Sequence, residues 1–126
     1  MNIKTNRLIA GLLAVIMALS MLPVSVFAAE ADLTISTLAE LQIFAADVNG
    51  GNAYEGKNIV LTADINLGGE TNPWTAIGTA SAPFRGTFDG GRHIISGLYI
   101  NAATGYQGLF GYLNGGIVRN ITVQGS

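Results

Sequence analysis

The chain has 126 residues, which allows one domain at most. Six basic residues stand against eight acidic ones, and no stretch gathers the basic residues into a patch that could neutralise phosphates, which argues against a nucleic-acid partner. There is no cysteine, so stability must come from burial and hydrogen bonding rather than from disulfides.

Residues 1–28 are predicted to be a secretory signal peptide. Two basic residues and no acid precede an apolar run at 8–22, and small residues then fit cleavage after Ala28 or Ala29. An uncleaved membrane anchor is the alternative, but the run is short for a span and is followed by a proline. Cleavage leaves four basic residues against eight acidic ones, a net charge of −4, or −3 if Glu30 is also removed. The mature chain is therefore expected to be exported and to have no membrane span.

Residues 29–57 are predicted to hold a short strand and one helix. Polar and apolar residues alternate at 32–35, which favours the strand. Thr37 and Glu40 form a capping box, in which a hydroxyl and a carboxylate satisfy backbone amides at the start of a helix. Apolar residues then recur at helical spacing, at Leu38, Leu41, Phe44, Ala45 and Val48. An Asn-Gly-Gly run supplies a left-handed stop, so the helix is expected over residues 38–48.

In residues 58–126 the apolar period shortens towards two, which indicates strands. Three segments, spaced 33 and 23 residues apart, share one pattern of an apolar residue, two others, a turn residue and an apolar ending: 61–67, 94–100 and 117–123. Asp64, Gly97 and Asn120 occupy the same place in this pattern, and all three tolerate the backbone of a sharp corner. A further alternating piece at 84–88 runs into Asp-Gly-Gly, which predicts a tight turn.

This spacing predicts coils of a parallel β-solenoid, because one coil uses roughly twenty residues and buries its apolar face only against its neighbours. The alternative is a flat antiparallel meander, in which the commoner hairpin connections join the strands. We expect the helix at 38–48 to cap the first coil, whose open edges would otherwise promote aggregation. Nothing comparable follows the last strand, so the solenoid is expected to be incomplete at its C-terminal end.

Gly-Leu-Phe-Gly-Tyr at 108–112, with Gly-Gly-Ile-Val-Arg-Asn-Ile-Thr-Val at 115–123, resembles the GLUG motif of bacterial secreted and cell-surface proteins. The segments at 74–78 and 84–90 resemble what commonly stands upstream of that motif. The likeness covers residues 58–126, most of the mature chain. It implies right-handed parallel β-helix coils, so the expected fold class is all-β with one N-terminal capping helix after the cleaved signal peptide. The family's repeats occur in adhesin-like surface proteins and beside the catalytic domain of immunoglobulin A-specific metallopeptidases.

His93, the one histidine, is the first candidate for catalysis or metal binding. With no cysteine and no His-Glu-x-x-His motif, a zinc site lacks its other ligands, so the family's peptidase activity does not carry over. We expect His93 to flank a turn beside Asp89. Asp64 and Asp89 could also form the carboxylate pair of a glycosidase, but a corner and a turn account for each more simply. We therefore expect no catalytic, cofactor-binding or metal-binding residue, and no cofactor.

Three other patterns have ordinary structural explanations. Gly105, Gly108 and Gly111 resemble a phosphate loop but lack its Lys-Ser/Thr ending and its helix, so corners of the chain explain them better. The Asn-Ile-Thr sequon at Asn120 is explained by a corner in the same way. Six aromatic residues could form a sugar-stacking strip, but we expect most of them to be buried: Trp74, Phe84, Phe88, Tyr99, Phe110 and Tyr112.

The resemblance and the signal peptide together predict a bacterial protein that is secreted or displayed at the cell surface. The expected function is a non-enzymatic, adhesin-like scaffold for binding or display, and its expected partners are host or cell-wall glycans or surface proteins. An enzymatic alternative remains open. In that case the chain would be the N-terminal part of a polysaccharide-degrading β-helix enzyme, or of a surface metallopeptidase, whose catalytic residues lie outside this chain.

Overall fold

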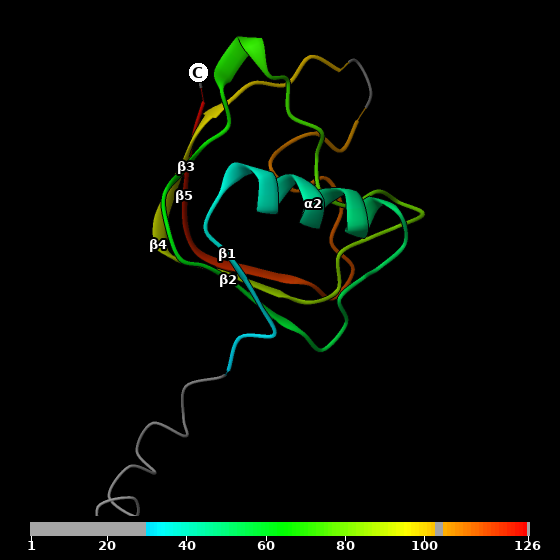
Figure 1. Ribbon diagram of the computed structural model, residues 1–126. Coiled ribbons are helices and arrows are strands. Elements are labelled where there is room, and N and C mark those ends of the chain that lie inside the picture. The colour runs from blue at the N-terminus through cyan, green and yellow to red at the C-terminus, as the bar shows by residue number, and fades with distance from the viewer. Residues whose placement is uncertain (1–29, 103–104, 126) are drawn as a thin grey trace, which may run out of the picture. The chain divides into compact units, whose positions relative to one another are not determined.

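A computed structural model describes residues 30–102 and 105–125 of the chain (Figure 1). The predicted signal peptide at 1–28 lies outside the described residues, and so does Ala29 at the predicted cleavage point. The chain divides after Glu30, and the fold below is that of the second unit, residues 31–126.

The described part of this unit is a mixed α/β domain with one parallel sheet of five strands. Its elements are, in order, β1 (Leu33–Ile35), α2 (Leu38–Asn49), β2 (Asn58–Leu61), β3 (Ile65–Asn66), the 3-10 turn η2 (Gly69–Thr71), β4 (Thr87–Leu98) and β5 (Ile117–Gly125). The sheet has the order β1-β2-β4-β3, with β5 paired to β4, and every pairing is parallel. Figure 1 shows the strands bending around α2.

The helix α2 starts and is oriented as its sequence dictates. Thr37 accepts the N–H of Glu40, and the Glu40 carboxylate accepts the N–H of Thr37, so the predicted capping box is confirmed. The helix ends at Asn49, and the left-handed residue after it is Gly51, with φ of 118°. Its buried side chains are four of the five that the spacing predicts, namely Leu41, Phe44, Ala45 and Val48.

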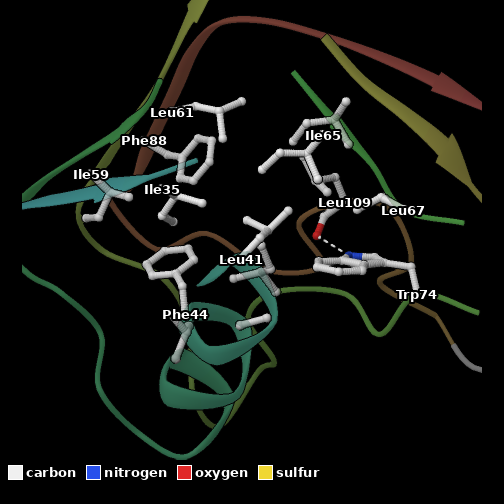
Figure 2. Packing of buried hydrophobic residues seen from close by; sticks show 14 of the residues in the cluster. Ile35, Leu41, Phe44, Ile59, Leu61, Ile65, Leu67, Trp74, Phe88 and Leu109 are labelled. Atoms are coloured by element: carbon white, nitrogen blue, oxygen red, sulfur yellow. Dashed lines mark hydrogen bonds between the residues drawn. The ribbon is translucent and has the colours of Figure 1, made fainter. Parts of the chain in front are cut away.

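The buried face of α2 shares one core with the sheet. Figure 2 shows Leu41 and Phe44 directed from the helix towards residues of the strands. The ring of Phe44 lies 5.7 Å, centroid to centroid, from both Phe84 and Phe88, and 5.1 Å from Tyr54. Leu41, Phe84 and Phe88 are fully buried and Phe44 very nearly so, which makes the helix a wall of the core.

The strand β4 contains the Asp-Gly-Gly run that was predicted to be a tight turn. The run is a bend inside one continuous strand, so the predicted turn between two separate strands is wrong. Gly91 and Arg92 take left-handed backbones with φ of 59° and 66°, and the N–H of Gly91 donates to the Asp89 carboxylate at 2.9 Å. A Cβ on Gly91 would lie 2.6 Å from the carbonyl oxygen of Leu61, so the neighbouring chain also requires glycine there.

The prediction of an all-β, right-handed parallel β-helix is wrong. Parallel pairing is present, but the strands form one sheet with an α-helix packed into its core, and they show no clear solenoid. The further sides of a coil would need strands in residues 73–84 and 105–116. In those segments the structure has loops joined by two isolated bridges, Ile77 to Phe110 and Phe84 to Leu113. The predicted cap at one end is accordingly a core helix.

The register of the sheet also differs from the predicted alignment of the three segments. The alignment places Ile65 opposite Leu98, whereas Ile65 pairs with Ile95, and Ile95 pairs with Val123. Paired residues of neighbouring strands are therefore separated by 30 and 28 residues in this row, and by 29 and 30 residues in the row of Ile59, Phe88 and Val118, rather than by 33 and 23. Apolar alternation fits several registers equally well, and the irregularity that follows Asp89 shifts the ladder in a way that the pattern does not signal.

Candidate functional site

Two loops that are distant in sequence are joined side by side, and the GLUG-like segment supplies one of them. Ile77 forms a parallel bridge with Phe110. The N–H of Ile77 donates to the carbonyl oxygen of Leu109 at 2.9 Å, and the N–H of Gly111 donates to the carbonyl oxygen of Ile77 at 2.8 Å. A Cβ on Gly111 would lie 2.7 Å from the carbonyl oxygen of Gly78, so the small residues permit this close approach.

Hydrogen bonds of two side chains attach the loop that carries Ile77 to neighbouring elements. The indole Nε1–H of Trp74 donates to the carbonyl oxygen of Leu109 at 3.1 Å, as Figure 2 shows, and this buried side chain is 6% exposed. Asn49, at the end of α2, donates its amide to the carbonyl oxygen of Ala76 at 3.0 Å and accepts the N–H of Gly78 at 2.7 Å. The loop is therefore attached to both the helix and the second loop.

A groove of about 370 Å³ opens beside the joined loops. Its walls carry an exposed aromatic ring, amides, hydroxyls and small residues, including Trp74, Thr75, Thr79, Asn101, Tyr106 and Gln107. Tyr106 is 65% exposed, has a left-handed backbone with φ of 60°, and meets Tyr112 edge to face at 5.2 Å between centroids. A second groove of about 320 Å³ lies between α2 and the segment around Trp74, lined in part by Gln42 and Asn49.

The carboxylate of Asp64 is used as a backbone acceptor. Its Oδ1 accepts the N–H of Ile94 at 2.9 Å and lies 3.2 Å from Nδ1 of His93. These two contacts, the Ile94 N–H first, hold the pKa of Asp64 below its usual value. A general acid near neutral pH needs a raised pKa, so this environment favours a fixed, ionised carboxylate. The predicted neighbour of His93 was Asp89, and that prediction is wrong.

Asp89 is similarly bonded to the bend and to the next strand. Its Oδ1 accepts the N–H of Gly91 at 2.9 Å and the side-chain amide of Asn120 at 3.3 Å, while Oδ2 accepts Nε–H of Arg119 at 3.3 Å. The Gly91 N–H, with Asn120 and Arg119, lowers the pKa of Asp89. Asn120 has φ of 56°, so the left-handed backbone expected there is present, as a bend inside β5 rather than as the corner of a coil.

The predicted sites are therefore distributed as follows. Trp74, Phe84 and Phe88 are buried, but the other three residues of the aromatic set are only partly buried, namely Tyr99, Phe110 and Tyr112, so burial holds for half of the set rather than for most of it. Tyr106 was not in that set, because an isolated tyrosine in a glycine-rich loop carries no periodic signal. Across residues 30–102 and 105–125, no three histidine, cysteine, aspartate or glutamate side chains are grouped so that they could hold a metal ion.

Comparison of the chain with protein-family models, with curated proteins and with solved structures gave no match. Within the described residues, no helix has both the length and the apolar character needed to cross a membrane.

Proposed function

We propose that this chain is an exported, non-enzymatic binding module, and that it binds a glycan in the groove beside Tyr106. The observation that carries the proposal is an exposed tyrosine ring in a groove whose other walls offer amides and hydroxyls. The predicted signal peptide and the resemblance to GLUG-motif surface proteins support export and an adhesin-like role.

A saccharide matches the chemistry of this groove. One face of a sugar ring carries C–H groups that stack on an aromatic ring, and its hydroxyls exchange hydrogen bonds with amides and alcohols. Tyr106 offers an amphipathic ring of this kind, and Asn101 and Thr79 offer polar groups on the same groove. The neighbouring small residues leave room for a ring to approach the backbone.

One wall of the groove and the ring of Tyr106 are held by neighbouring elements, which favours binding. The bridge between Ile77 and Phe110 and the hydrogen bond from Trp74 to Leu109 attach the two loops. The contact with Tyr112 restricts the ring of Tyr106. A site whose loops are ordered before the ligand arrives loses less conformational entropy on binding.

The two carboxylates that could form a glycosidase pair are held in their ionised form, which fits a binding role better than a hydrolytic one. Asp64 and Asp89 accept backbone N–H groups, and both have lowered pKa values. Retaining and inverting glycosidases alike need one protonated carboxyl group as the acid. Neither of these side chains is in an environment that would keep it protonated at neutral pH.

Isothermal titration with defined tetrasaccharides of glucose, N-acetylglucosamine and mannose tests the proposal. We expect saturable binding of at least one probe, and Tyr106→Ala should weaken it roughly tenfold, the size of a lost aromatic contact of about 1.5 kcal/mol. Tyr106→Phe keeps the ring and should retain most of the affinity. Ile43→Ala is the matched control, because Ile43 is 70% exposed on α2 and does not line the groove.

Binding that is unchanged by Tyr106→Ala would move the glycan site elsewhere and contradict the proposed groove. Absence of binding to all probes, together with binding to a host surface protein, would replace the glycan by the other predicted class of partner. Chromatographic detection of shortened probes after incubation would contradict a non-enzymatic role.

A further inference from the structure

The last strand of the sheet has one free edge. β5 pairs with β4, and in residues 30–102 and 105–125 no strand pairs with its other side. The nine-residue strand contains no proline and no lysine, the residues that commonly protect such edges. Its one charge, on Arg119, is 3.3 Å from the Asp89 carboxylate of the preceding strand. Unpaired backbone groups therefore lie along an edge with a neutralised charge.

The hydrophobic core is also left open along this edge. Phe88 and Ile95 of β4 face the core and are fully buried. Their register partners in β5 are Val118 and Val123, which must face the same side of the sheet. Val118 is half-buried, and Val123 is 40% exposed. Within the part of the chain that the structure describes, apolar side chains of β5 are therefore left uncovered, which is the arrangement that a further strand would complete.

We propose that β5 is a dimer interface, on which the β5 strand of a second copy of this chain pairs in antiparallel orientation. A two-fold axis between Asn120 and Ile121 places Val118 of each copy opposite Val123 of the other. This register keeps the core-facing side chains of both strands on the same side. The bend at Asn120 then lies beside the same bend of the second copy, because the axis passes through the bend and relates the first half of one strand to the second half of the other.

The charges favour this pairing over contact with the opposite edge of the sheet. In the proposed register Arg119 lies opposite Thr122, so no like charges meet across the interface. The ion pair between Arg119 and Asp89 of the same copy is kept. The β1 edge is three residues long and is preceded by Glu30 and Asp32. Head-to-tail contact between β5 and β1 would pair a third of β5 and would generate open chains rather than a closed dimer.

Sedimentation velocity and light scattering across a concentration series test the interface, with the full chain expressed with its leader and recovered from the medium. We expect a dimer whose share rises with concentration, and Val123→Lys should shift it to monomer. Ile43→Lys places the same charge on a 70%-exposed apolar residue of α2 and should leave the dimer unchanged. Circular dichroism verifies that each variant is folded.

A cross-linking experiment tests the register itself, because the chain has no cysteine of its own. Val118→Cys and Val123→Cys are prepared separately, mixed and oxidised. The proposed register predicts a covalent dimer from the mixture and little from either variant alone. A monomer at every concentration, equal effects of Val123→Lys and Ile43→Lys, or cross-linking without this preference would each overturn the proposal.

Discussion

The carboxylate of Asp64 accepts the backbone N–H of Ile94, thirty residues further along the chain, at 2.9 Å. This one bond ties the segment between β2 and β3 to the middle of β4. His93 Nδ1 lies 3.2 Å from the same oxygen, so a single exposed carboxylate serves two groups of the neighbouring strand. The stability of the fold is therefore expected to depend on pH through Asp64.

Loss of this bond should lower stability in a defined pH window. The pKa of Asp64 is lowered in the folded state, chiefly by the Ile94 N–H. A lowered pKa adds stability above the unfolded value of 3.8, and that stability is lost as the pH falls below it. Asp64→Ala should therefore lower the melting temperature at pH 6 more than at pH 3. Glu70→Ala, at another exposed acid, is the control, and an equal effect at both pH values would contradict the linkage.

Gly97 is expected to be a position where a side chain is costly. It has φ of 70°, and a Cβ there would lie 2.6 Å from Oδ1 of Asn66. Gly97→Val should destabilise the fold by more than about 1 kcal/mol, because strain and close contact add. Gly105→Val is the matched control, since a Cβ on Gly105 meets nothing within 4 Å. Chemical denaturation of both variants measures the difference, and equal midpoints would disprove the strain.

Tyr54 should titrate at unusually high pH. Burial of the phenol, with the hydrogen bond that it donates to Asp47 at 2.5 Å, raises its pKa to about 12. A raised tyrosine pKa adds stability below the unfolded value of 10.0, and that stability is lost as the pH rises towards about 12. In an ultraviolet titration that follows phenolate absorbance, the tyrosine ionisation at the highest pH should be missing from Tyr54→Phe. Asp47→Asn should move that ionisation to lower pH, and no movement would exclude Asp47 as a cause.

The exported form is expected to begin at Ala29 or Glu30. The reason is the basic start, apolar run and small-residue ending of the predicted signal peptide. Intact-mass measurement of protein recovered from the medium gives the first residue directly. A secreted chain that retains residues 8–22 would contradict cleavage, and a variant with Ala28→Arg, which places a large charge at the cleavage point, should slow processing.

The parts of the fold that were predictable are those encoded locally. The start of α2 follows from Thr37 and Glu40, which stand three residues apart and bond only to their neighbours in sequence. The buried face of α2 follows from helical spacing. By contrast, the pairing of Ile65 with Ile95 depends on a contact across the chain, and several apolar positions satisfied the same alternation.

The candidate site was harder to predict because its signal is three-dimensional. The GLUG-like segment has a pattern that can be read from the sequence, but its contact with Ile77 and Trp74 is visible only in the fold. Tyr106 is notable for its exposure, which composition does not reveal. The helix was expected to cap an end of the strands. Its apolar residues instead fill the core, because the sheet bends around them.

Replacing both Leu41 and Phe44 by Asp should therefore unfold the domain rather than release a separate helix. Leu41 is fully buried, and Phe44, which is 1% exposed, contacts the rings of Phe84 and Phe88. Truncation of one such side chain costs about 2–5 kcal/mol, and a charge at the same place costs more, against a typical total stability of about 5–15 kcal/mol. Ile43→Asp, on the exposed face of the same helix, should change stability little. Far-ultraviolet circular dichroism and thermal melting would compare the variants. A double variant that keeps the strand signal and a cooperative melt would show that the sheet folds without α2.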